Sequence, residues 1–214
     1  KTSLPFTPGS ARKLGRRAQT QSGVSVEKVI YRPAVRQDAR RIAELFSIAS
    51  DGVSDYIWSK ISQPGDNLLD IGQQRYERKN TPFSFENCLV ADKNDLVVAV
   101  LLSYEMRADN DYVEDDPVLK PFWLLEEPKS LYVAGIAVDE SSRQQGIAAT
   151  LMEMTEAKCR KLKLAKLSLI VFEANTVAYD LYSRRGYTEV MRKAIVPHQS
   201  IHYTGDALLL VKKL

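Results

Sequence analysis

The spacing of apolar and polar residues along the chain predicts several helices that bury one face. Apolar side chains recur every three or four positions in residues 38–49, so a helix is expected to begin at Asp38. The same spacing predicts a longer helix over residues 145–162 and a short one over 176–184. Residues 51–78 carry scattered aromatic residues around a Pro-Gly break, which favours one or two shorter helices joined by a loop.

Between these helices, runs rich in β-branched and aromatic residues predict strands. They lie at residues 27–32, 87–91, 96–104, 131–138, 168–172, 187–196 and 207–212. The second and third runs are separated by Asp92-Lys93-Asn94-Asp95, a sequence typical of a hairpin turn. Strands and helices in this order predict an α/β fold, with a mixed sheet and helices on both faces.

Composition and charge narrow the picture further. The chain has 214 residues, of which 44% are hydrophobic and 27% charged, and this excludes wholesale disorder. Its longest apolar run, residues 96–102, is too short to cross a membrane. The formal net charge is +3, but residues 1–23 hold five basic residues and no acid, so residues 24–214 carry −2. We therefore expect a basic extension at residues 1–25 and a single domain at 26–214.

Cysteine usage indicates the compartment. Cys88 and Cys159 lie far apart and follow the spacing of neither a metal site nor a disulfide framework. We expect both to be reduced thiols packed inside a cytoplasmic protein, and we expect no metal. The basic N-terminal residues contain no apolar segment followed by a cleavage site, so a secretory signal is not expected.

The segment with the clearest chemical meaning joins the strand at 131–138 to the long helix, and it includes Arg143-Gln144-Gln145-Gly146-Ile147-Ala148. A helix that starts here presents free backbone N–H groups and a partial positive charge to a phosphate. Gly146 and Ala148 leave room for its approach, and Arg143 adds a cation. The segment lacks the motifs of a dinucleotide fold and of a P-loop. Taken alone, it is equally consistent with an ordinary strand–turn–helix connection.

A second segment, residues 168–187, favours the phosphate interpretation. It combines a strand, a helical sequence and an aromatic exit, in which the notable residues are Asn175, Ala178, Leu181, Tyr182, Gly186 and Tyr187. Together the two segments resemble the GNAT superfamily of N-acetyltransferases. The acetyl-CoA motif of that family, R/Q-x-x-G-x-G/A, is matched by Arg143, Gly146 and Ala148.

The resemblance extends more loosely over about residues 28–214 and leaves the basic extension outside. It implies a GNAT-like acyl-CoA N-acyltransferase fold, with a mixed, mostly antiparallel central sheet of about six to seven strands. It also implies transfer of an acetyl group from acetyl-CoA to a primary amine of a small molecule, peptide or protein, by direct attack in a ternary complex.

The same resemblance implies a set of coenzyme-binding residues. They are Ile136, Ala137, Val138, Arg143, Gln144, Gln145, Gly146, Ile147, Ala148, Ala149, Asn175 and Tyr182. The backbone of residues 136–138 would pair with the pantetheine, and one N–H there would stabilise the oxyanion. Residues 144–149 and Arg143 would hold the pyrophosphate. Asn175 could bond to the pantetheine or cap the helix that follows it.

For the chemistry, the resemblance implies that Tyr182 protonates the departing CoA thiolate, a role that suits a phenol because it is protonated at neutral pH. The glutamate that many members carry on the strand ahead of the phosphate loop corresponds here to Tyr132. The candidate general bases are therefore Glu105 and Glu173, which lie at strand ends and would act directly or through water. A solvated charge at the end of a strand accounts for each of them more simply.

The acceptor pocket should come from residues 51–78, 105–127 and 197–205. The last of these contains His198 and His202, which are further candidates for the base. Acidic residues in 105–127 would favour a cationic amine, although a solvated acidic surface accounts for them more simply.

Two other functions are alternatives to acetyl transfer. A non-catalytic acyl-CoA sensor or docking module would keep the phosphate turn and need no acid, so a Tyr182→Phe variant distinguishes it from an enzyme. A nucleic-acid-binding function is disfavoured, because the basic extension lacks interleaved aromatic residues. The expected partners are acetyl-CoA and an amine, with no nucleic acid and no membrane. Whether the protein forms a homodimer is left open.

Overall fold

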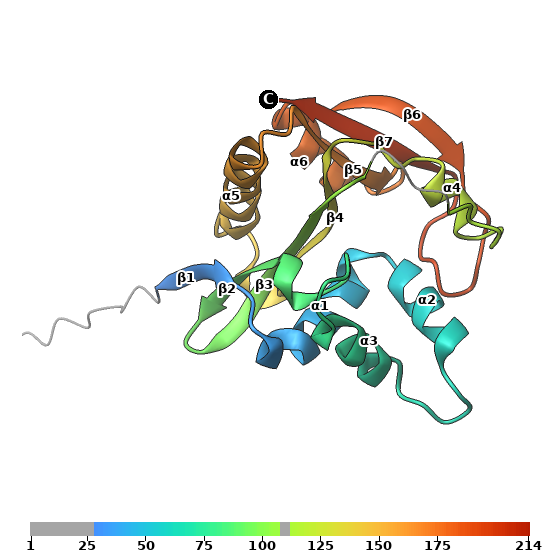
Figure 1. Cartoon of the computed structure of the whole chain (residues 1–214), viewed down its shortest axis with the longest axis horizontal. Helices are drawn as coiled ribbons and strands as arrows, with labels where there is room; N and C mark the ends of the chain where they lie inside the picture. The colour runs from blue at the N-terminus through green and yellow to red at the C-terminus, as the bar shows by residue number, and fades with distance from the viewer. Residues whose placement is uncertain (1–27, 108–111) are drawn as a thin grey trace, which may run out of the picture.

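A computed structural model describes residues 28–107 and 112–214 (Figure 1). Its strands are β1 (Val29–Pro33), β2 (Cys88–Lys93), β3 (Leu96–Glu105), β4 (Leu131–Val138), β5 (Lys166–Phe172), β6 (Thr188–Ala194) and β7 (Asp206–Lys213). Its α-helices are α1 (Ala39–Ala49), α2 (Val53–Ile61), α3 (Leu68–Glu77), α4 (Lys120–Trp123), α5 (Ile147–Lys161) and α6 (Thr176–Arg184). The expected extension at residues 1–25 and the part of the acidic segment at 108–111 lie outside the described residues.

The strands form one seven-stranded sheet in the order β1-β2-β3-β4-β5-β7-β6. All neighbouring strands are antiparallel except β4 and β5, which are parallel and are joined through α5. The expected mixed, mostly antiparallel sheet is confirmed. Pro33 lies in the edge strand β1, where its missing N–H costs no ladder bond to a second neighbour.

Most elements lie where the sequence predicted them, with ends shifted by a few residues. α5 begins at Ile147, two residues later than expected, because Gln144 and Gly146 have positive φ values of 59° and 77°. A right-handed helix excludes such values. The hairpin between β2 and β3 turns at Asn94 and Asp95, whose φ values of 54° and 62° suit a tight turn that follows the twist of the strands.

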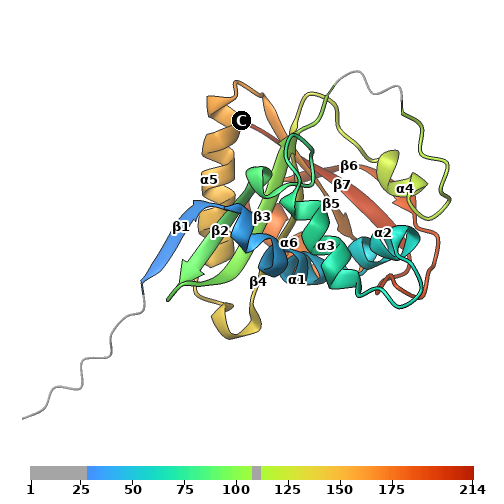
Figure 2. The same cartoon turned by 60° about the horizontal axis from the view of Figure 1, so that its bottom comes forward.

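Helices cover both faces of the sheet, as Figures 1 and 2 show and as the sequence predicted. One core lies between the sheet and α5 and α6, and contains the buried thiol of Cys159. A second core lies between the opposite face and α1 and α3, and contains the buried thiol of Cys88. A third cluster joins β5 and β7 to α2, to the region around α4 and to the β6–β7 connection. Both cysteines are free, in agreement with the prediction.

The feature of the sheet that positions the site is the separation of β4 from β5. The two strands pair only from Leu131 to Val133 on β4, although β4 continues to Val138. At this point Leu102 pairs with Gly135 and Ser103 with Val133, so Ala134 is an extra residue on β4. A bulge of this kind bends its strand and increases its twist. We attribute the opening between β4 and β5 to this bulge, and α1 packs against it closely, since a Cβ on Gly135 would lie 3.0 Å from the Phe46 ring.

Candidate active site

A cavity of about 230 Å³ lies where β4 ends and α5 begins. It is lined by Val138, Ser142, Arg143, Gln144, Gly146, Ile147, Ala148, Ala149 and Leu181. All but Leu181, which comes from α6, belong to the end of β4, to the connection that follows it or to the first turn of α5. The cavity therefore coincides with the turn that the sequence singled out as a phosphate site.

The backbone at this turn offers donors to an anion. The first hydrogen bond of α5 runs from the Thr150 N–H to the Gly146 carbonyl at 3.1 Å. The N–H groups of Ile147, Ala148 and Ala149 precede it and have no acceptor within the helix. Because the partial positive charge of the helix is also at this end, the turn suits a pyrophosphate.

Side chains of the turn are held clear of these donors. The Arg143 guanidinium donates from Nε to the Val138 carbonyl at 3.2 Å, and the Gln145 amide donates to the Ser141 carbonyl at 3.3 Å. A Cβ on Gly146 would meet nothing within 4 Å, so the glycine is required here for its positive φ rather than for space.

β4 and α6, which carries Tyr182, both border this cavity, through Val138 and Leu181. Residues 135–138 of β4 pair with β3 on one side and have no partner in β5 on the other. Tyr182 is 7% exposed, and its ring lies edge-on to that of Tyr187 at 5.8 Å. Burial raises the pKa of the Tyr182 phenol, and the nearby Asp51 carboxylate raises it further. The phenol is therefore held protonated at neutral pH.

Asn175 caps α6, as one of its two expected roles required. Its side-chain oxygen accepts from the Ala178 N–H at 3.2 Å. Its amide nitrogen donates to the Asp51 carboxylate at 3.3 Å, which ties the start of α6 to the turn between α1 and α2. Its proposed contact with pantetheine stays a prediction.

The two candidate bases lie in different surroundings. Glu105 ends β3 and is exposed, whereas Glu173 follows β5 and is ion-paired with Arg192 at 2.9 Å. Tyr132, at the position of the family's glutamate, has its ring 5.5 Å from that of Tyr104. Burial raises the pKa of Tyr132, with smaller contributions from the Glu126 and Tyr182 charges.

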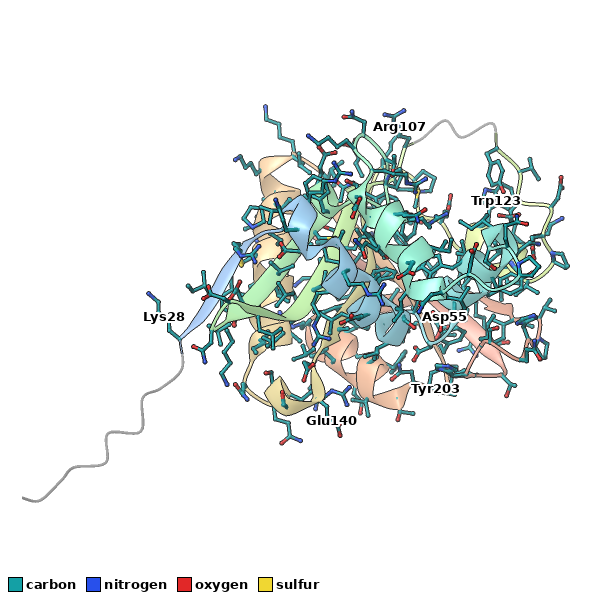
Figure 3. All side chains as sticks on the ribbon, turned by 90° about the horizontal axis from the view of Figure 1, so that it is seen from below. Lys28, Asp55, Arg107, Trp123, Glu140 and Tyr203 are labelled. Carbon is teal, nitrogen blue, oxygen red and sulfur yellow. The ribbon has the colours of Figure 1, made fainter. Side chains whose placement is uncertain are left out.

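The two histidines lie in the β6–β7 connection, beside α1 and α2. His198 stacks against Tyr56 with ring centroids 4.5 Å apart, and its Nδ1 accepts from the Ser200 N–H at 3.1 Å. His202 is exposed, and its backbone N–H donates to the Asp51 carbonyl at 3.0 Å. Figure 3 labels Tyr203 of this connection and Asp55 of α2, on the side where the two segments meet.

The acidic segment is partly a structural tether. The Asp116 carboxylate accepts from the Tyr56 hydroxyl at 2.9 Å and pairs with Lys60, and these bonds lower its pKa to about 2. Glu127 pairs with Lys166. Glu126 is half-buried and, within the residues that the structure describes, makes no side-chain hydrogen bond or ion pair, so burial raises its pKa. The segment is therefore only partly the solvated surface that the sequence favoured.

The structure brings together most of the predicted coenzyme residues. Seven of them line the cavity, while Ile136 and Ala137 lie on the unpaired part of β4. Two cavity residues, Ser142 and Leu181, were not predicted to bind coenzyme, although both lie within the quoted motifs. The proximity of Asp51 to Tyr182 was also missed, since no local pattern links residues so far apart in the chain.

Comparison with known proteins identifies the family. The sequence profile of the Acetyltransferase (GNAT) family matches residues 56–187. This range covers more than half of the chain and includes the turn at Gly146 and the helix that carries Tyr182. The chain belongs to this family.

Individual relatives agree with this assignment. The chain is 32% identical over 116 residues to "GCN5-related N-acetyltransferase 10, chloroplastic" from Arabidopsis thaliana, a match that covers 54% of this chain and 44% of that protein. Its fold is similar to "The crystal structure of acetyltransferase", with a TM-score of 0.61, 18% identity, and coverage of 86% and 98% of the two chains. It is also similar to "Crystal structure of the NatC complex bound to Gag peptide and CoA", with a TM-score of 0.54, 16% identity, and coverage of 87% and 99%.

These similarities have defined limits. At such low identity the structural matches establish the fold alone. The match to the plant protein spans less than half of that protein's length. Within residues 28–107 and 112–214, no helix combines the length and the apolar character that a membrane span requires.

Proposed function

We propose that this protein transfers an acetyl group from acetyl-CoA to a primary amine, and that residues 26–214 form one N-acetyltransferase domain. The observation that carries the proposal is that β4 and α6 line the same cavity at the start of α5. Val138, at the end of the unpaired edge of β4, and Leu181, which precedes the buried Tyr182 on α6, both contribute to it. Acetyl-CoA is a substrate here, and the free N–H groups at Ile147, Ala148 and Ala149 fit its pyrophosphate.

Each of these elements would hold or act on one part of acetyl-CoA. Unpaired backbone groups on Ile136, Ala137 and Val138 would pair with the pantetheine arm and place the thioester beside Tyr182. A backbone N–H aimed at the carbonyl oxygen would stabilise the oxyanion by about 3 kcal/mol. Tyr182 would then donate its proton to the leaving thiolate.

The acceptor class is a cationic amine that loses a proton before it attacks. Glu105 and Glu173 remain the candidate bases suggested by the sequence, with His198 and His202 as further candidates. The printed name of the NatC structure mentions a peptide, so peptide amines belong among the acceptors to be tested alongside small amines.

The test is an assay of free CoA thiol released from acetyl-CoA with a panel of amines. The panel contains spermidine, N-α-acetyl-lysine and a tetrapeptide with a free N-terminus. We expect release with at least one amine and none without protein. CoA binding without turnover on any amine would favour the alternative, a non-catalytic acyl-CoA-binding module.

Replacing Tyr182 with Phe separates the same two functions. We expect kcat to fall by about 100-fold, because general acids contribute on this scale, with CoA affinity changed by less than about two-fold. Tyr179→Phe is the matched control, since it lies on the same helix and carries the same chemical change. Equal turnover of both variants would remove Tyr182 from the mechanism.

The compartment has two candidates. The reduced thiols of Cys88 and Cys159 favour the cytoplasm, whereas the printed name of the plant relative describes that protein as chloroplastic. Residues 1–23 are basic and free of acids, a composition that a plastid transit segment shares. Imaging a fluorescent fusion of the full chain distinguishes cytoplasm from plastid.

A further inference from the structure

We propose that Asp51 is the carboxylate that binds the ammonium group of the acceptor and takes its proton. This inference rests on the proposed acetyl transfer and extends it to a residue that neither the motif nor the expected bases include. It is carried by the position of Asp51, which lies in the turn between α1 and α2, at the junction of three segments that are distant in sequence.

Contacts from two other segments fix the turn. The Asn175 amide donates to the Asp51 carboxylate at 3.3 Å, from the start of α6. The His202 N–H donates to the Asp51 carbonyl at 3.0 Å, from the β6–β7 connection. The next residue, Gly52, packs so tightly that a Cβ would lie 1.7 Å from the Ser200 carbonyl oxygen. The Asp51 carboxylate is therefore held in place rather than free to swing into solvent.

The groups that face this carboxylate are mostly neutral. They are Asn175 and Tyr182 from the α6 side, and His202 and Tyr203 from the β6–β7 connection. Burial raises the pKa of Asp51, while the Asn175 hydrogen bond and the His202 charge oppose this rise. No Lys or Arg pairs with Asp51 among the described residues, so an ammonium group could bind the carboxylate without displacing a lysine or arginine side chain.

Asp51 is also tied to the helix that carries the general acid. Its partner Asn175 caps α6 seven residues before Tyr182, which places both on one side of that helix, and the Asp51 charge adds to the rise that burial causes in the pKa of Tyr182. A base near the acid is the arrangement that the reaction needs, because the attacking amine and the leaving thiolate share one acetyl carbon.

The other carboxylates are less suited. Glu105 is exposed, and Glu173 already pairs with Arg192. Glu126 influences Tyr104 and Tyr132 rather than Tyr182. A base that is exposed to water or neutralised by a guanidinium is a weaker proton acceptor than a half-buried free carboxylate.

The proton and bond changes balance in this scheme. The ammonium loses one proton to Asp51, and the neutral nitrogen attacks the acetyl carbonyl carbon. The C–N bond forms and the C–S bond breaks with its electron pair on sulfur. That sulfur takes the Tyr182 proton, the second proton lost by the nitrogen restores Tyr182, and Asp51 releases its own proton to solvent.

Asp51→Asn tests the inference with little cost to the turn. Asp51 has a φ of 49°, and Asn tolerates this left-handed conformation better than other side chains do. Asp55→Asn is the matched control, since Asp55 is a carboxylate four residues away that accepts from the Ser47 hydroxyl at 2.7 Å. Both variants are compared with Glu105→Gln and Glu173→Gln, using the panel amine with the highest kcat/KM.

The expected result is a pH-dependent loss in one variant. At pH 7, Asp51→Asn should lower kcat/KM about 100-fold, the scale of a general base, and Asp55→Asn should stay within about three-fold of the original protein. Glu105→Gln and Glu173→Gln should each lower kcat/KM less than Asp51→Asn does. Toward pH 10 the difference in kcat/KM between the original protein and Asp51→Asn should shrink to within about ten-fold, because an alkyl amine then loses its proton without help. CoA affinity should stay unchanged in all of them.

A purely structural role gives a different result. If Asp51 acted only by holding Asn175, replacing Asp51 would lower CoA affinity, and kcat/KM would be reduced by the same factor at every pH. An unchanged kcat/KM in Asp51→Asn, or the largest loss in Glu105→Gln or Glu173→Gln, would overturn the inference and leave acetyl transfer standing. If the original protein released no thiol with any amine, the proposed function would fail and this inference with it.

One further variant covers the possibility that Asp51→Asn does not fold. In the original protein, kcat/KM should fall below neutral pH as Asp51 takes up a proton. Asp51→Glu keeps a carboxylate, so the same fall should persist in it. Loss of that acidic limb in a folded Asp51→Glu protein would contradict the role of the carboxylate.

Discussion

The turn into α5 that we propose binds the coenzyme, the coenzyme turn, and the region that we propose receives the amine, the acceptor side, are built in different ways. The turn into α5 is formed by consecutive residues, and its donors are backbone groups at one helix start. The acceptor side is assembled from the α1–α2 turn, the segment around Asp116 and the β6–β7 connection, which are joined by side-chain and backbone contacts. A site of the first kind depends on local conformation, and a site of the second kind depends on packing between distant segments.

The largest effect expected from this difference is at Gly52. In Gly52→Ala, the new Cβ would lie 1.7 Å from the Ser200 carbonyl oxygen, and the residue has a φ of 92°. Overpacking and backbone strain together should lower the free energy of unfolding by about 3–5 kcal/mol. Thermal or denaturant unfolding measures the loss, and kcat/KM for the amine should fall more than CoA affinity.

Gly65→Ala is the control for Gly52, because Gly65 has a similar φ of 96° and no atom within 4 Å of the added Cβ. Backbone strain alone should lower the free energy of unfolding of this variant, by about 1–2 kcal/mol. Equal destabilisation by the two substitutions would show that packing against Ser200 does not hold the acceptor side together.

A smaller effect, on coenzyme binding and not on the acceptor side, is expected at Gly146. Gly146→Ala adds no clash, but the positive φ of 77° costs about 1–2 kcal/mol and disturbs the N–H groups of the turn. CoA affinity should fall about ten-fold, and KM for the amine should change little. Calorimetric titration with CoA measures the first quantity. Gly205→Ala, with an equally open site and a φ of 98°, should leave CoA affinity intact.

The smallest effect concerns the tether at Asp116. Asp116→Asn removes the charge that pairs with the half-exposed Lys60 but keeps an oxygen for the Tyr56 hydroxyl. Ion pairs with exposed partners contribute little, so KM for the amine should rise by no more than about three-fold. Since the pKa of Asp116 is lowered to about 2, its charge is lost only as the pH falls through that value. The pH profile of kcat/KM between pH 6 and 9 should therefore be the same in the variant, and a changed profile would give Asp116 a chemical role.

Prediction from the sequence succeeded where the signal was local. The strand at Leu131–Val138 and the helix at Thr176–Arg184 have the predicted bounds, because the apolar pattern of each lies within the element and the cap of the helix, Asn175, directly precedes it. The turn singled out as a phosphate site coincides with a cavity, and the sequence could point to it because its glycine and its helix start are adjacent. The start of α5 was placed two residues too early, since the positive φ of Gln144 leaves no trace in the pattern.

The rest of the site was decided by packing. The separation of β4 from β5 depends on the bulge at Ala134, and Gly135 is its one trace in the sequence. The exposure of Glu105 and Glu173 agrees with solvated charges at strand ends, whereas the pairing of Glu173 with Arg192 depends on a neighbour in space that the sequence does not specify.

The sequence by itself determined the family, the order of the elements, the coenzyme turn and the place of Tyr182, since each is encoded by residues within one segment. Only the tertiary structure decided which carboxylate lies near that tyrosine. Asp51 and Tyr182 are separated by most of the chain, and they meet because the α1–α2 turn, Asn175 and the β6–β7 connection close on one another. Contacts of this kind follow from the free energy of the whole packed domain, which no short pattern specifies.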